Sequence, residues 1–123
     1  MTSGLAKASD LQVAMEGSNE DAVVRLRGRL SIDSSPAFRE QLLALVRRAS
    51  TKAAVVDLTE VSYIDASGIA TLVEALKIAR NRRNNLCLNG LHGRVLHLFK
   101  VTGLLDLFRT NGCRSASTLS KVT

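Results

Sequence analysis

The feature that most constrains this 123-residue chain is a mostly apolar run, followed by a loop and then an amphipathic segment. The run, residues 53–58, has the length and composition of a strand buried in the middle of a sheet. After the loop, apolar residues recur at i, i+3, i+4 and i+7, which predicts a helix from about Ser67 to Arg80. We therefore expect Ser67 to be the N-cap of that helix. Its hydroxyl would lie beside unpaired backbone N–H groups at the positive end of the helix dipole, where a phosphate is well tolerated.

The remaining periodic segments alternate between strands and helices after an initial hairpin. At 24–30, apolar positions alternate with Arg25, Arg27 and Arg29, which predicts a strand with one wet face. Helices must then cover mainly the opposite face, so the expected class is α/β with a mixed sheet of four to five strands. The other expected elements are a strand at 11–15, a helix that starts near Ser34 with an apolar stripe to Ala49, a strand at 86–88, and a helix at 95–102 closed by Gly103.

Length and composition predict one domain with its own apolar core, because 46% of the residues are hydrophobic. No segment resembles a signal peptide or a membrane span, so we expect a cytoplasmic protein without stable membrane insertion. The net charge of +6 is compatible with nucleic acid, an anionic membrane or an acidic protein partner. The four aromatic residues offer no stacking platform for bases, which argues against nucleic acid.

Other chemistries are poorly supported by the motifs. A serine hydrolase would use Ser67 with His92 or His97 as its base, but the nucleophile elbow needs glycine where Asp65 stands. The glycine-rich sequences of the common nucleotide sites do not occur, and the cysteines lack the spacing of a zinc site. We therefore predict no catalytic residues, no bound metal and no cofactor.

The sequence Asp65-Ala66-Ser67-Gly68 resembles the Asp-x-Ser-Gly motif of the STAS domain of bacterial anti-sigma factor antagonists, in which the serine is phosphorylated. Residues 24–30 resemble the early strand of that family, and residues 94–108 resemble its later helix and Gly-Leu turn. The resemblance covers residues 20–110. It implies a single STAS-like domain at 10–110, with a flexible N-terminus at 1–9 and an edge segment or loose tail at 111–123.

The resemblance also implies a function in bacterial signal transduction and transcription regulation. The chain would be an anti-sigma factor antagonist that binds an anti-sigma factor, itself an ATPase-type serine kinase, and phosphorylation of Ser67 would reverse the partner switch. ATP and magnesium would belong to that kinase, and a phosphatase would restore the serine, so the chain would not be an enzyme. The alternative is a STAS interaction subunit of a membrane ABC-type lipid transport complex that needs no phosphorylation.

The expected partner surface surrounds Ser67. Asp65 would orient the serine hydroxyl or face the partner; otherwise it is an acidic residue that stabilises a helix N-terminus. Gly68 would leave the approach of a kinase unobstructed, and Thr71 is either a second phosphorylation site or a packing residue. The family's early strand ends in Gly-x-Leu-Asp, whereas here Ser31 follows Leu30 and an aspartate comes two residues later. The predicted partner-binding residues are Ser31, Asp33, Asp65, Ala66, Ser67, Gly68 and Thr71.

Overall fold

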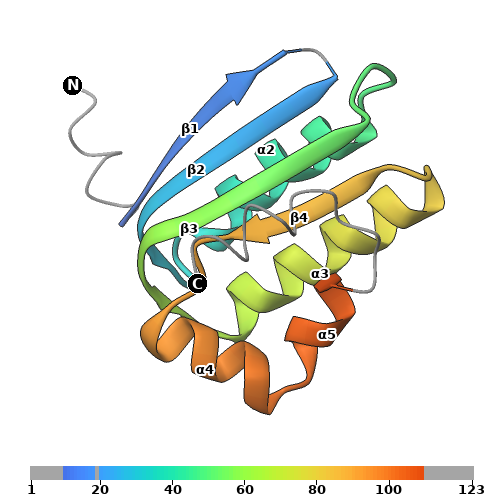
Figure 1. Ribbon diagram of the computed structural model, residues 1–123. Coiled ribbons are helices and arrows are strands. Elements are labelled where there is room, and N and C mark those ends of the chain that lie inside the picture. The colour runs from blue at the N-terminus through green and yellow to red at the C-terminus, as the bar shows by residue number, and fades with distance from the viewer. Residues whose placement is uncertain (1–9, 19, 110–123) are drawn as a thin grey trace, which may run out of the picture.

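The computed structural model describes residues 10–18 and 20–109, and within them the chain forms a four-stranded mixed sheet. The strand order is β1-β2-β3-β4 (Figure 1). β1 and β2 form the predicted antiparallel hairpin, while β2, β3 and β4 are parallel to one another. The strands are Leu11–Gly17 (β1), Asp21–Leu30 (β2), Ala53–Ile64 (β3) and Asn85–Asn89 (β4).

β3 is longer than the apolar run predicted, because it continues for six residues past Leu58. Its pairing with β2 shifts register twice, once between Arg25 and Arg27 and once between Gly28 and Arg29. At each shift β3 advances by one residue more than β2, as at a β-bulge. The bulges interrupt the inward and outward alternation, so the second half of β3 loses the pattern by which a strand is recognised in a sequence.

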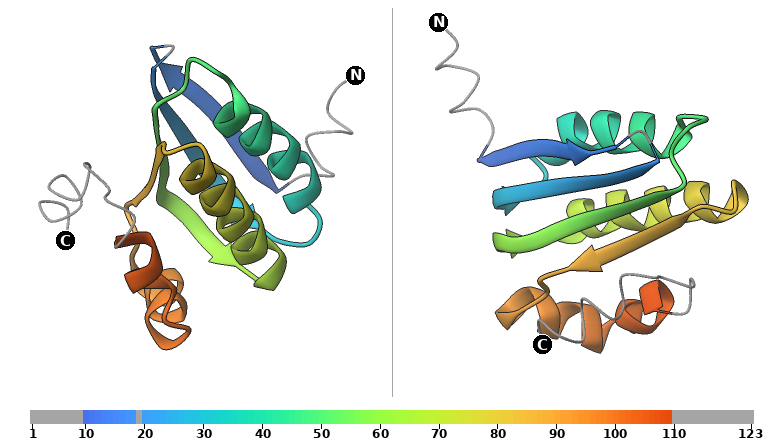
Figure 2. Two further views of the ribbon diagram at one scale, coloured as in Figure 1. Left: turned by 90° about the vertical axis from the view of Figure 1, so that its right-hand side faces the viewer. Right: turned by 45° about the horizontal axis from the view of Figure 1, so that its top comes forward.

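Two helices cover one face of the sheet, as expected for a strand with a wet opposite face. They are α2 (Ser35–Arg47) and α3 (Ala66–Asn81), which lie side by side (Figure 2). Their inward stripes meet the apolar positions of β2 and β3, and the central residues of this core are fully buried. α2 ends at Arg47, so Ala49 is exposed beyond the helix and the apolar stripe is shorter than predicted.

The opposite face of β2 carries the three alternating arginines, and each is paired with an acid. Arg25 contacts Glu16 and Asp57, Arg27 contacts Glu60, and Arg29 contacts Asp10, all at 3.3–3.9 Å. The Arg29 guanidinium also lies 4.3 Å from the centre of the Tyr63 ring. The positive charge of this strand is therefore largely balanced within the sheet.

The chain closes the β4 edge with two short helices, α4 (Gly93–Val101) and α5 (Leu104–Arg109) (Figures 1 and 2). The rings of Phe99 and Phe108 pack at a centroid distance of 6.1 Å and join the apolar core. Within residues 10–18 and 20–109, no helix has the length and apolar character needed to cross a membrane. The predicted end segments, 1–9 and 111–123, lie outside the described residues.

Candidate functional site

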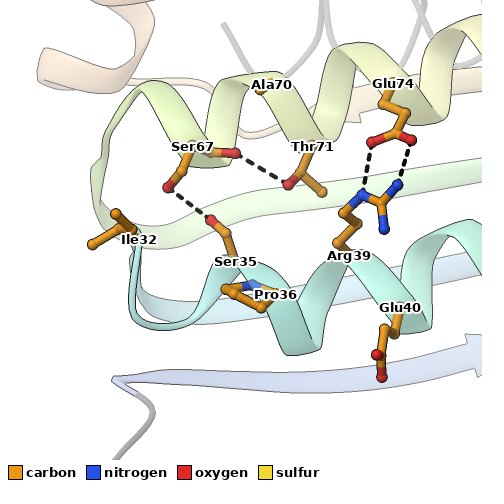
Figure 3. A pocket seen from close by; sticks show the side chains of 9 residues that line it. All are labelled: Ile32, Ser35, Pro36, Arg39, Glu40, Ser67, Ala70, Thr71 and Glu74. Atoms are coloured by element: carbon orange, nitrogen blue, oxygen red, sulfur yellow. Dashed lines mark hydrogen bonds and ion pairs between the residues drawn. The ribbon is translucent and has the colours of Figure 1, made fainter.

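Two helices begin at the same end of the sheet, just beyond the last residues of β2 and β3. α2 starts with Ser35, and α3 carries Ser67 in its first turn. The hydroxyl oxygens of these two serines lie 3.1 Å apart, so the helix starts face each other (Figure 3). The strand ends are also tied together, because the Asp65 N–H donates to the Leu30 carbonyl. Residues 32 positions apart in the sequence thus form one surface.

Asp65 is the N-cap of α3, and its carboxylate organises this surface. Oδ1 accepts hydrogen bonds from the backbone N–H groups of Ser67 and Gly68 at 3.0 and 3.2 Å, and from the Ser67 hydroxyl at 2.6 Å. Oδ2 accepts a bond from the Ile32 N–H at 3.0 Å, which joins the loop before α2 to the start of α3. The bond from the Ser67 hydroxyl, supported by these backbone N–H groups, lowers the pKa of the Asp65 carboxyl below its ordinary value.

The prediction that Ser67 is the N-cap is wrong, because Asp65 occupies that position and Ser67 is the second residue of the helix. The side chain of an N-cap residue accepts hydrogen bonds from the backbone N–H groups that follow it. Here the Asp65 carboxylate, and not the Ser67 hydroxyl, accepts these bonds. The Ser67 hydroxyl is instead a donor to that carboxylate. Ser67 is half-buried, and its hydroxyl still opens onto the surface between α2 and α3.

Gly68 is required by packing against the sheet. It is buried, and a Cβ placed there would lie 2.7 Å from Leu30 Cγ and 2.8 Å from Ile64 Cγ1. The missing side chain therefore points toward the core, whereas the sequence interpretation had it clearing an approach from solvent. The glycine lets the first turn of α3 come close to β2 and β3, which sets the position of Ser67.

A groove of about 400 Å³ runs from this point along the seam between α2 and α3 (Figure 3). On the α2 side, one turn after Ser35, Arg39 forms a forked ion pair with Glu74 of α3, at 2.8 Å for Nε and 2.6 Å for Nη2. The bonds from this guanidinium lower the pKa of Glu74, and the same pairing raises the pKa of Arg39. The lining residues are Ile32, Ser35, Pro36, Arg39, Glu40, Ser67, Ala70, Thr71 and Glu74.

The other predicted site residues surround Ser67 in different environments. Ala66 and Asp33 are exposed, the former at the first position of α3 and the latter in the loop before α2. Ser31 is 8% exposed, and its hydroxyl accepts a bond from the Asp33 N–H. Thr71 is 4% exposed, and its hydroxyl donates to the Ser67 carbonyl one turn earlier.

Ile32, Ser35, Arg39 and Glu74 belong to the same surface but were not predicted as site residues. The start of the helix at Ser34-Ser35-Pro36 was visible in the sequence, and it is the signal that would have placed Ser35 at this end of the fold. Arg39 and Glu74 are 35 positions apart in the sequence, so no local pattern predicts that they form an ion pair.

The hydrolase alternative finds no support in this geometry. The ring of His92 lies with Nε2 2.8 Å from the Thr59 carbonyl oxygen, whereas the Ser67 hydroxyl contacts Asp65 and Ser35. No group of three or more metal-ligating side chains of the kind that holds an ion occurs among the described residues.

Comparisons with known proteins agree with this architecture. The anti-sigma-B factor antagonist of Bacillus subtilis (strain 168) is 29% identical over 98 residues, which is 80% of this chain and 88% of that protein. The Staphylococcus epidermidis protein of the same name is 34% identical over 88 residues, which is 72% of this chain and 81% of its own. The solved structure of the anti-sigma factor antagonist SpoIIAA in its unphosphorylated form has the same fold, with a TM-score of 0.69, 18% identity, and coverage of 76% of this chain and 82% of that one.

A family model also matches most of the chain. It is the model for "Mlab, STAS domain", and it aligns with residues 13–109, which include all the described strands and helices apart from the first residues of β1. The four-stranded mixed sheet agrees with the fold that the sequence resemblance implied. The chain therefore belongs to the STAS domain family.

Proposed function

We propose that this protein is an anti-sigma factor antagonist that binds an anti-sigma factor of the ATPase-type serine kinase class, and that phosphorylation of Ser67 turns this binding off. The observation that carries the proposal is the setting of the Ser67 hydroxyl. It lies in the first turn of α3, hydrogen-bonded to Asp65, on the surface where the starts of α2 and α3 meet. The names of the Bacillus and Staphylococcus relatives support the same role.

The fold offers a reason why the chain would survive phosphorylation. A phosphate adds a charge of about −1.5 to −2 at pH 7, and the N–H groups and dipole of a helix start favour such a charge. Ser67 is half-buried and its hydroxyl lies at the open groove, so the phosphate would extend into solvent without entering the core. We expect the sheet and helices to keep their arrangement.

The interface would change more than the fold does. The phosphate would replace the hydroxyl that now donates to Asp65 at 2.6 Å, so two negative groups would stand together on the binding surface. A partner would have to desolvate both. A loss of about 3–4 kcal/mol at the interface would weaken binding by roughly 10² to 10³. That range is sufficient for a switch.

The exposed residues around Ser67 would supply the contact area. Ile32 is 69% exposed in the loop held by Asp65, and Asp33 in the same loop and Ala66 at the start of α3 are also exposed. This surface combines one large apolar side chain with small and acidic residues. A non-obligate interface is about as apolar as the rest of a protein surface, so this mixed surface is compatible with a reversible contact.

The first test is intact mass and site mapping of the protein purified from its native cells, under growth and stress conditions. Phosphate on Ser67 supports the proposal. Its absence under every condition contradicts the switch and favours a constitutive STAS interaction subunit, such as one docked to the ATPase of a membrane transport complex. Recovery of such an ATPase with the unphosphorylated chain would identify that alternative.

The second test measures binding to a purified ATPase-type anti-sigma factor from the same genome. We expect Ser67→Ala to bind as the unphosphorylated protein does and Ser67→Asp to bind more weakly. The matched controls are Ser50→Ala and Ser50→Asp, because Ser50 is an exposed serine beyond the far end of α2. Equal binding by the two Ser67 variants would count against the switch.

A further inference from the structure

We propose that Arg39 binds the phosphate on Ser67, so that phosphorylation transfers the Arg39 guanidinium from Glu74 to the phosphate while the Ser35 hydroxyl donates a further bond to it. This inference rests on the proposed function, because it takes Ser67 as the modified residue. It adds a charge-exchange step within the groove between α2 and α3 and assigns roles to three residues outside the Asp-x-Ser-Gly motif. All four side chains line that groove (Figure 3).

The geometry brings Arg39 within reach of the phosphate. α2 and α3 start at the same end and run side by side, since Ser35 meets Ser67 and Arg39 meets Glu74 further along both helices. Arg39 follows Ser35 by one turn, a rise of about 6 Å. Side chains on a helix tilt toward its N-terminus, which is the direction of Ser67. A rotation of the arginine side chain therefore carries the guanidinium toward the phosphate without moving the backbone.

The existing ion pair is exposed enough to exchange its partner. The side chains of Arg39 and Glu74 are 48% and 39% exposed, and surface pairs of this kind contribute little to stability. A phosphate of charge about −1.5 to −2 offers more charge than one carboxylate, and its oxygens match the fork of a guanidinium. The exchange also leaves the Glu74 carboxylate in contact with water.

The acidic surroundings of Ser67 favour a cation beside the phosphate. Asp65 bonds Ser67 directly, and Glu40 and Glu74 also line the groove. Among the described residues that line it, Arg39 alone is cationic. A phosphate on Ser67 would therefore lie beside the Asp65 carboxylate, and the Arg39 guanidinium is the group in the groove that offsets this repulsion.

The exchange would extend the effect of phosphorylation along α3. Glu74 lies seven residues after Ser67, about two helical turns or roughly 10 Å along the axis. When the guanidinium leaves, the Glu74 carboxylate becomes an unpaired negative charge on the same side of the molecule. A partner would then meet a changed charge at both ends of the groove, although only one residue has been modified.

The test installs the phosphate directly, by incorporating phosphoserine at position 67 during translation, and follows it by phosphorus NMR as a function of pH. The second pKa of a free phosphoserine is about 6. If Arg39 pairs with the dianion, Arg39→Gln raises this pKa by about one unit, a tenfold change in proton affinity, relative to the otherwise unchanged protein. Arg27→Gln is the matched control, since Arg27 pairs with Glu60 on the far face of the sheet and should leave the phosphate unaffected.

Three further measurements follow the exchange, and the first of them, on Arg39 itself, separates direct pairing from a general charge effect. The Nε–H resonance of Arg39 should shift on phosphorylation and should titrate with the phosphate. The pKa of Glu74, which Arg39 now lowers, should rise when Ser67 carries phosphate. Glu74→Gln should lower the pKa of the phosphate, because the guanidinium then has no competing carboxylate.

An unchanged phosphate titration in Arg39→Gln, or an Arg39 Nε–H resonance that ignores phosphorylation, overturns the inference. Circular dichroism and thermal unfolding of each variant establish that it is folded, as expected for a substitution at an exposed position. The test does not depend on phosphorylation in the native cell, because the phosphoserine is incorporated during translation. A failure of the proposed function is therefore distinguishable, since it appears in the native protein as a Ser67 that carries no phosphate.

Discussion

Replacing Asp65 with alanine should destabilise the protein by about 1.5–3 kcal/mol. Loss of a capping side chain costs about 1–2 kcal/mol, and Asp65 caps α3 through the N–H groups of Ser67 and Gly68. The bond from the Ile32 N–H to Oδ2 joins two separate segments and adds about 0.5–1 kcal/mol. Solvent reaches Ile32, which holds this second contribution at the lower end of its usual range. Urea unfolding at pH 7 measures the sum.

Asp65→Asn separates the two contributions. The asparagine carbonyl oxygen can still accept from the Ser67 and Gly68 N–H groups, but its amide nitrogen cannot accept from Ile32. We therefore expect a loss of only about 1 kcal/mol. If Asp65→Ala costs no more than Asp65→Asn, the cap contributes little and the account of the helix start is wrong.

The contribution of Asp65 to the free energy of unfolding should depend on pH, and a comparison of the wild type with Asp65→Asn measures it. The pKa of Asp65 is lower in the folded protein than in the unfolded chain, where an aspartate titrates near about 3.9. Its contribution to stability is therefore fully present above about pH 4 and is lost as the pH falls through the lower pKa of the folded state. The difference in unfolding free energy between the wild type and Asp65→Asn should be constant from pH 7 to 5 and should shrink below pH 4. A difference that stays constant down to pH 2 would contradict the assigned hydrogen bonds.

Two substitutions test the packing that positions the site. Gly68→Ala should lower the free energy of unfolding in urea by about 1–3 kcal/mol, because the new Cβ would lie under 3 Å from atoms of Leu30 and Ile64. An unaltered midpoint of urea unfolding would mean that α3 shifts away without cost. Phe99→Ala should cost about 3–5 kcal/mol, since its ring is fully buried between α4, α5 and the sheet. Val101→Ala, on the same helix but 63% exposed, is the control and should stay within about 0.5 kcal/mol; similar losses in both would show that the α4 packing is not as described.

Local periodicity predicted most of the fold, because the residues that set a strand or a helix are close together in the sequence. The alternation of arginines with apolar residues at 24–30 correctly placed β2 with one wet face, and the helical spacing after Ser67 correctly placed α3. Where the alternation of buried and exposed residues is interrupted, the end of a strand could not be predicted from the sequence. β3 continues past Leu58 through two bulges, and its second half was assigned to a loop for that reason.

The start of α3 shows the limit of motif reading. Asp65 and Ser67 are both good capping residues, and only the backbone conformation decides that Asp65 caps while Ser67 donates to it. The reason for Gly68 is likewise hidden in the sequence, because the atoms that exclude a side chain there belong to Leu30 and Ile64 on neighbouring strands.

The sequence alone set the order of the strands and of the helices as far as α4, the arginines on the open face of β2, and the position of Ser67 between a buried strand and an amphipathic helix. These depend on the chemistry of near neighbours. Tertiary structure alone decided that Ser35 stands 3.1 Å from Ser67 and that Arg39 pairs with Glu74, since parallel strands brought two distant helices side by side with their starts at one end. The charges around Ser67 therefore depend on how α2 and α3 pack together, and no single stretch of the sequence shows that arrangement.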